Sequence, residues 1–367
     1  MRRITHRHWT CLPAGLALSA ILIAFWYLNQ DYMSPGRSTS VFLENPLPAF
    51  GLMVFGAFVA AFIAGEFAIR VPLTVEPLIF AFVGGGIAGA GSIIAGMSVN
   101  SVVLFNLAGV FTLPAFMISK GWLYLAFLIA GGAVGSRLLV IGTLKLAPAT
   151  RRILVPAALN GRRSRLVYLG LGCLLVTCLA AAFIVAAPAA SRGSVALAML
   201  LMTMIGFAAE RSTVCMSSML KELFISHSAY VWRNVLFAIM CLALLYQLGL
   251  VFSLYAPIEV DAYVTAPALL ASGSFIMGVG FVFADGCFIG SLWKTGQGNV
   301  INVAGLFGLV VGIGAMQMLG EFFSLPASGS SIPNRLASVV DSWLLVAVLW
   351  MLGLSALLLF RPARYRY

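Results

Sequence analysis

The chain has 367 residues, of which 62% are hydrophobic and only 9% are charged, and its mean hydropathy is +1.04. A soluble protein carries roughly a quarter of its residues as charged ones, so this composition excludes a soluble enzyme or binding domain. The net charge of +11 does not indicate a nucleic-acid-binding protein, because the basic residues cluster beside apolar segments and not on a folded domain.

The long apolar runs determine the predicted fold class. A helix needs about 20 apolar residues to cross a bilayer, and several runs reach that length. The alternating pattern of a membrane barrel is absent, and only helices or closed barrels satisfy the backbone in lipid. The sequence therefore predicts an all-α, polytopic integral membrane protein that is embedded in the lipid bilayer.

The N-terminal segment is interpreted as an uncleaved membrane helix. Three arginines among the first seven residues precede the apolar run "LPAGLALSAILIAFWYL", which ends in bulky aromatic residues without a small-residue cleavage pattern. Residues 1–47 are thus expected to form one helix and a short external loop. Basic residues also fill a linker at 145–166 and the tail that follows a last helix within 321–367. The positive-inside rule then places both termini and the linker in the cytoplasm.

The basic linker divides two hydrophobic halves, residues 48–144 and 167–320, which are predicted to be two similar transport repeats. Each half contains a glycine-rich block, "GGGIAGAGSIIAGMSVNSVV" in the first and "MGVGFVFADGCFIGSLWKTGQG" in the second. Membrane transporters are commonly built from two such halves, with sites on discontinuous helices near the midplane. The glycine-rich helices are therefore expected to be broken or re-entrant.

The two blocks can be aligned on their glycines. Gly89 aligns with Gly278, an offset of 189 (278 − 89), and the same offset places Ser98 opposite Cys287. Upstream of the blocks, Glu66 aligned with Glu210 gives an offset of 144 (210 − 66). The smaller offset predicts an apolar insertion of 45 residues (189 − 144) in the second half.

One charged pair is also predicted in the first half. Glu66 and Arg70 are four residues apart and would face each other on a helix.

The segment at 283–299, "FADGCFIGSLWKTGQGN", is the strongest candidate site. Glycines such as Gly286 let backbone approach a solute, and a half-helix that begins inside the membrane directs its free N–H groups at an anion. Lys294 is seven residues after Cys287, about two helical turns on, and is expected on the same face. Asp285 and Lys294 favour a functional interpretation, because ionisable groups are costly at membrane depth. As alternatives, the glycines serve only helix packing and Lys294 reaches to the membrane interface.

A second candidate site lies in "GFAAERSTVCMSSMLKELF", residues 206–224. Arg211 precedes Cys215 by four residues, so a guanidinium one helical turn away could tune the thiol. The alternative is that Glu210 and Arg211 neutralise each other and only anchor the helix.

The remaining cysteines indicate no metal or cofactor site. The chain has six cysteines without a C-x-x-C pair and without metal-ligand spacing to its three histidines, so no metal, no cofactor and reduced thiols are expected. Three of the six are interpreted as small packing residues of membrane helices: Cys173, Cys178 and Cys241.

These motifs resemble the two signatures of the YeeE/YedE family of sulfur-anion membrane transporters, and the glycine-rich first half looks most like its YedE branch. The first signature has an R-x-x-x-C core, which Arg211 and Cys215 match, and a later Arg-Asp pair, which Lys221 and Glu222 replace. The second reads G-x-G-x-x-x-A-G-G-C-x-x-G-x-x-x-R-x-x-E-G. Seven positions match it: Gly278, Gly280, Ala284, Gly286, Cys287, Gly290 and Gly298.

The resemblance implies a permease in the bacterial inner membrane that imports thiosulfate or a related sulfur- or selenium-containing anion. Cys215 and Cys287 would be relay thiols on the path, and Ser98 would replace a cysteine found in many family members. Three positions depart from the second signature: Asp285 for a glycine, Lys294 for the arginine and Gln297 for the glutamate. Ser98 and the negative charge of Asp285 put the substrate in question.

A permease that is not an enzyme is thus the leading hypothesis, and two alternatives remain open. An intramembrane thiol oxidoreductase would need thiols that can meet, and no close pair is visible in the sequence. A sulfur-relay protein would hand sulfur to a soluble carrier on the cytoplasmic side. No nucleotide-binding motif is present in the sequence, so ATP hydrolysis by this chain is not expected.

Overall fold

A computed structural model describes residues 46–95, 122–145, 151–154, 192–226 and 267–322, together with isolated positions elsewhere. Ser98 and most of the predicted segments 1–47, 145–166 and 321–367 lie outside the described residues. The elements in chain order are α4 (Pro46–Ala64), β1 (Ile69–Pro72), α5 (Glu76–Ile94), α8 (Trp122–Lys145), β2 (Arg151–Leu154), α10 (Arg192–Ser212), α11 (Met216–Lys221), the π-helix η6 (Glu222–Ser226), α13 (Pro267–Phe283), α14 (Phe288–Gly296) and α15 (Val300–Phe322).

The described part is almost entirely helical, as predicted for a multi-pass membrane protein. Three of its helical stretches are long and apolar enough to cross a bilayer: Glu76–Ile94, Met199–Ile225 and Ala268–Gly296. Large apolar side chains on α5, α8 and α15 are exposed, for example Phe80, Ile141 and Phe307. Buried polar residues lie inside the helix packing, so the protein presents apolar surface outward as lipid requires.

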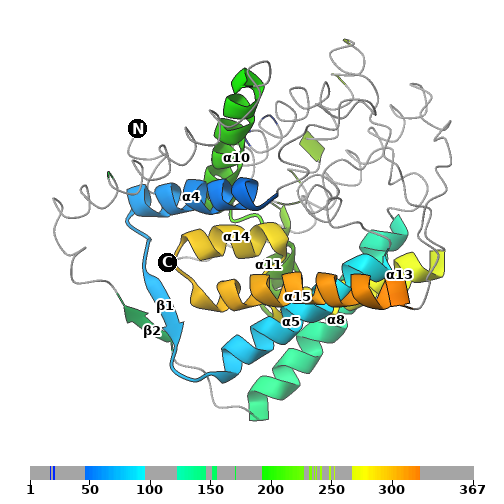
Figure 1. The fold of residues 1–367 in the computed structure, drawn as a ribbon. Helices are drawn as coiled ribbons and strands as arrows, with labels where there is room; N and C mark the ends of the chain where they lie inside the picture. Colours follow the sequence, from blue (N-terminus) through cyan, green and yellow to red (C-terminus); the bar gives the residue numbers. More distant parts are fainter. Residues whose placement is uncertain are drawn as a thin grey trace.

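The two later stretches are interrupted. The break within Ala268–Gly296 confirms the prediction of a broken helix for the second glycine-rich block, whereas the described part of the first block is continuous within α5. Met199–Ile225 contains the break between α10 and α11, and Ala268–Gly296 contains the break between α13 and α14. The short helix α14 packs between α4 and α15, and α15 packs along α5 (Figure 1). α13 packs against both α5 and α8.

One local prediction for the first half is wrong. The chain leaves the helical conformation after Ala64, with Gly65 at a φ of 75°, and residues 69–72 form strand β1. Glu66 and Arg70 therefore do not share a helix face. β1 pairs antiparallel with β2 from the basic linker, with Ile69 opposite Leu154.

Reciprocal contacts show that α4 and α10 are equivalent elements. A Cβ added to Gly56 would lie 1.9 Å from the carbonyl oxygen of Thr203. A Cβ added to Gly206 would lie 2.0 Å from the carbonyl oxygen of Met53. Both pairs are 150 residues apart (206 − 56 and 203 − 53). The observed offset of 150 replaces the predicted 144.

The helices α5 and α13 are related in the same way, with the predicted offset. A Cβ on Gly91 would lie 2.8 Å from the carbonyl oxygen of Gly273, and a Cβ on Gly280 would lie 2.7 Å from that of Gly84. The offsets are 280 − 91 = 189 and 273 − 84 = 189. The difference between the two offsets (189 − 150) reduces the predicted insertion from 45 to 39 residues.

α8 and α15 complete the relation, because α8 packs on α13 as α15 packs on α5. Gly131 approaches the carbonyl of Phe275, and Gly312 approaches the carbonyl of Gly86 at equivalent places. In both pairs, α4 with α10 and α5 with α13, residues later in one helix contact residues earlier in the other, so the two helices are antiparallel. A two-fold axis that relates antiparallel helices is perpendicular to them, and inverted repeats of membrane transporters are related by such an axis. The two transport repeats themselves stay a prediction.

Candidate functional site

The two helix breaks have the same local backbone. α10 ends at Ser212, Thr213 has a φ of 54°, and Cys215 is the extended residue that caps α11. α13 ends at Phe283, Asp285 has a φ of 58°, and Cys287 is the extended residue that caps α14. Each break thus consists of a left-handed residue followed two positions later by a cysteine at a helix N-terminus.

The two cysteines meet. The Cys287 S–H donates to Cys215 Sγ across 3.8 Å, and both residues are buried. Cys287 Sγ also accepts from the backbone N–H of Gly290 at 3.3 Å, in its own helix, and from that of Met216 at 3.4 Å, in α11. The expectation that no thiol pair is close was wrong, because packing brings together residues that are 72 positions apart.

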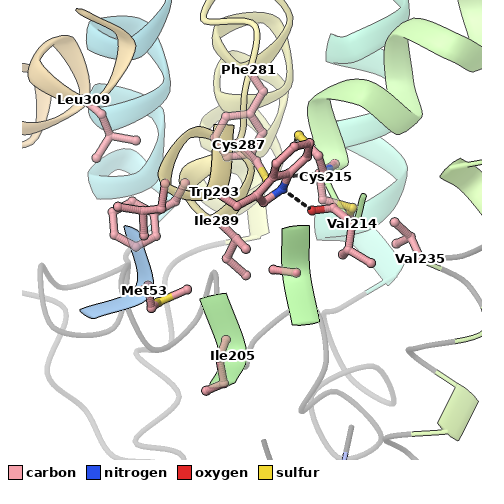
Figure 2. Close-up of a cluster of buried hydrophobic side chains, with 14 of the residues drawn as sticks. Met53, Ile205, Val214, Cys215, Val235, Phe281, Cys287, Ile289, Trp293 and Leu309 are labelled. Carbon is pink, nitrogen blue, oxygen red and sulfur yellow. Dashed lines mark hydrogen bonds between the residues drawn. The ribbon is translucent and has the colours of Figure 1, made fainter. Parts of the chain in front are cut away.

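Two further hydrogen bonds hold the breaks together. Trp293 Nε1 in α14 donates to the carbonyl oxygen of Val214 at 2.9 Å, inside the first break. Ser217 in α11 donates to the carbonyl oxygen of Phe281 at 2.6 Å, in the last turn of α13. Figure 2 shows Trp293, Val214 and both cysteines within one cluster of buried side chains.

Two glycines make the close approach possible. A Cβ on Gly290 would lie 2.1 Å from Cys215 Sγ and 3.3 Å from Cys287 Sγ. A Cβ on Gly286 would lie 2.2 Å from Ser291 Oγ. Both positions therefore require a residue without a side chain, which gives a physical reason for two glycines of the second signature.

A cationic cluster surrounds the second break. Lys221 Nζ forms an ion pair with Asp285 Oδ1 at 2.7 Å, and Lys294 Nζ lies 3.7 Å from Asp285 Oδ2. Lys294 also donates to the backbone carbonyl of Asp285, as does Asn302 Nδ2 at 3.2 Å. Lys294 therefore turns toward the break, with 13% of its side chain exposed. Two lysines face one carboxylate here, so the cluster has an excess of one positive charge.

Sequence reasoning missed part of this cluster. Lys221 enters the sequence-based prediction only as a replacement within the first signature, and Asn302 is not part of that prediction. Asn302 is fully buried, and its Oδ1 accepts no hydrogen bond.

An anionic cluster surrounds the end of α10. Arg211 binds both carboxylate oxygens of Glu210 and donates to Glu66 at 2.7 Å. Gln297, at the end of α14, donates to Glu210 at 2.9 Å. Glu210 and Arg211 are fully buried, so they are more than an anchor at a membrane face.

The predicted one-turn relation between Arg211 and Cys215 does not apply, since the helix ends between them at Ser212. The guanidinium instead joins α10 to the segment after α4 through Glu66. Two carboxylates and one guanidinium give this cluster an excess of one negative charge. Among the described residues, no group of three or more His, Cys, Asp or Glu side chains is arranged to hold a metal ion.

The sequence profile of a family described as "Sulphur transport" matches residues 211–366, which begin at Arg211 and include both cysteines of the pair. A protein of Salmonella typhimurium described as "Probable transporter YedE" is 26% identical over 267 residues, 68% of this chain. The match covers 60% of that relative's length. No solved structure matches the chain. The two matches confirm the resemblance to the YeeE/YedE family.

Proposed function

We propose that this sulphur-transport relative is a permease, not an enzyme, which imports thiosulfate or a related sulfur- or selenium-containing anion through the membrane. The observation that carries the proposal is the contact between Cys215 and Cys287 at 3.8 Å, where two half-helices begin inside a membrane protein. Transporters place their substrate sites on discontinuous helices of this kind.

The thiols suit a sulfur anion for a physical reason. Thiosulfate has two negative charges and a soft, polarizable terminal sulfur, which a neutral S–H group contacts weakly. Conduction requires sites that are favourable enough to enter and weak enough to leave. Cys215 and Cys287 therefore act as successive contacts, and Ser98 supplies a hydroxyl in the same role in the first half.

The surrounding charges adjust the path for an anion. Lys221 and Lys294 attract it, while Asp285 neutralises one of the two lysines so that the solute is not trapped. Gly286 has no side chain and so lets Ser291 and the start of α14 pack closely at the break, where N–H groups of a helix N-terminus favour negative charge. Glu210 and Arg211 hold the first break in position beside this site.

The proposal includes orientation and partners. The protein lies in the bacterial inner membrane with the basic segments, and so both termini and the linker, in the cytoplasm. A soluble sulfur carrier that receives the anion's sulfur would dock on that side.

Uptake of radiolabelled thiosulfate tests the function in cells that lack their own sulfur-anion importers. We expect the wild-type chain to restore uptake and Cys287→Ala to abolish it at unchanged membrane abundance. Cys241→Ala, which alters a buried thiol outside the pair, is the matched control and should retain uptake. A wild-type chain that moves neither thiosulfate nor selenite contradicts the proposal.

The oxidoreductase alternative gains support from the same 3.8 Å contact, since thiols that can meet were its missing requirement. It predicts electron transfer from a membrane quinol pool to a thiol oxidant without movement of labelled anion. Flux of thiosulfate in vesicles that contain no quinone would decide for the permease.

A further inference from the structure

We infer that Cys215 and Cys287 form a reversible disulfide that locks the permease closed, an inference that rests on the proposed function. A low-molecular-weight disulfide is the class of oxidant that would form this bond. The pair would thus be a site of oxidative modification as well as a contact for the anion.

The geometry at the pair favours a disulfide. An S–S bond is about 2.05 Å long, so the two sulfurs at 3.8 Å need to approach by about 1.8 Å. Two hydrogen bonds keep the starts of α11 and α14 side by side. Trp293 donates to the carbonyl oxygen of Val214, and Ser217 donates to the carbonyl oxygen of Phe281. The pair is therefore preorganised by groups other than the thiols themselves.

Contact between the thiols also closes the space that an anion would need. The backbone of Gly290 lies against both sulfurs, close enough that even a methyl group would collide with Cys215 Sγ. No anion fits between the sulfurs at this separation, so passage requires the starts of α11 and α14 to separate. A covalent bond between them prevents that movement.

The reaction proceeds by thiol–disulfide exchange. One protein thiolate attacks the small disulfide and releases one small thiol, and the second protein thiolate then displaces the other. Two S–H bonds of the protein and one S–S bond of the oxidant are replaced by one protein S–S bond and two S–H bonds of the small thiols. Each protein sulfur is oxidised by one electron and each oxidant sulfur is reduced by one.

Burial restricts when the reaction occurs. Cys215 is 1% exposed and Cys287 is 5% exposed, so the oxidant reaches them only when the breaks separate. The lock is therefore expected to form in protein that is able to open.

The test uses the full chain in proteoliposomes, treated with 2-hydroxyethyl disulfide and then with dithiothreitol. Mass spectrometry of peptides from the alkylated protein should show Cys215 linked to Cys287 after the first treatment and free after the second. Thiosulfate uptake should fall to the background of empty liposomes and recover with the reductant. Cys241→Ser should behave like wild type, which excludes the third described thiol as the partner.

Three results distinguish failures. The absence of a linked peptide after oxidation overturns the inference, and so does a linked peptide with unchanged uptake. If the reduced wild-type chain shows no uptake, thiosulfate is not its substrate. The linked peptide alone then tests whether Cys215 and Cys287 form a disulfide. Cys215→Ser and Cys287→Ser, where they retain uptake, should be insensitive to the oxidant.

Discussion

The two helix breaks share a backbone and differ in their surroundings. Thr213-Val214-Cys215 and Asp285-Gly286-Cys287 each pass through a left-handed residue to an extended cysteine at the start of a half-helix. At the first break the ion pair between Arg211 and Glu210 is completely buried, while Glu66, the second partner of Arg211, leaves 30% of its side chain exposed. At the second, the ion pair between Lys221 and Asp285 leaves 21% and 26% of the two side chains exposed.

This difference assigns distinct tasks to the two breaks. Buried charges that satisfy one another join helices, because leaving any one of them unpaired is costly. Partly exposed charges can exchange partners with a solute at little cost. Under the proposed function, the break after α10 is therefore the rigid side of the site, and the break after α13 is the side that would meet the anion.

The largest effect should come from the buried network. Arg211→Met leaves Glu210 charged and buried without its cation, and we expect a loss of about 3 to 5 kcal/mol of stability. Lys221→Met at the other break should cost no more than about 1 kcal/mol, since its ion pair is partly exposed. Thermal unfolding in detergent measures both. Equal losses at the two positions would remove the distinction between a rigid and a solute-facing break.

A smaller effect is expected where the breaks touch. Gly290→Ala places a methyl group 2.1 Å from Cys215 Sγ, so the thiols must move apart. Overpacking of this kind costs about 1 to 3 kcal/mol, and uptake of thiosulfate should be lost. Gly314→Ala is the matched control in α15, where an added Cβ meets nothing within 4 Å. Uptake by the Gly290 variant at the control's level would show that the thiol contact is dispensable.

The sequence predicted features that depend on local pattern. Helix breaks followed from glycines and polar residues inside apolar runs, and the offset of 189 between Gly91 and Gly280 followed from the glycine blocks. The predicted pairing of Glu66 with Arg70 was wrong, because a four-residue spacing brings side chains together only within a helix. The helix α4 instead ends before them, and Gly65 has a positive φ. The predicted offset of 144 between α4 and α10 was wrong, because it rested on an alignment of charged residues and not of the glycines at which the two helices touch.

Pairing between distant residues could not be predicted from local pattern. Lys221 and Asp285 are 64 positions apart, and Arg211 and Glu66 are 145 apart. The sequence offered a local interpretation for these residues instead. Lys221 was a replacement within the first signature, and Glu66 was half of a predicted helical pair. Only the packing of broken helices against one another decides which charges meet.

The two cysteines should differ in their structural contribution. Cys287 Sγ accepts N–H groups from Gly290 and Met216, so Cys287→Ala leaves two buried donors without an acceptor. Cys215 makes no side-chain cap of its own helix. We expect Cys287→Ala to lose about 1 to 2 kcal/mol more than Cys215→Ala, measured by thermal unfolding in detergent, although both should lose uptake. A larger loss for Cys215 would mean that the caps do not stabilise the breaks.

The smallest effect concerns the left-handed residue of each break. A residue with a Cβ is strained there by about 1 to 2 kcal/mol, and glycine relieves this strain but loses about 0.5 to 1 kcal/mol in chain entropy. Thr213→Gly should thus stabilise the protein by about 0.5 kcal/mol. Its hydroxyl bonds only the adjacent Ser212 carbonyl, among the contacts described for it, so little is lost with the side chain.

Asp285→Gly relieves the same strain and introduces the glycine of the second signature, yet it should gain no stability. The change removes the carboxylate that pairs with Lys221 and Lys294 and leaves two lysines close together. The excess charge should bind a dianion more tightly, which lowers the KM for thiosulfate and slows its release. Thermal unfolding and uptake kinetics in the same preparation separate these effects. A stabilised Asp285→Gly with unchanged kinetics would show that this carboxylate serves the backbone turn and not the anion.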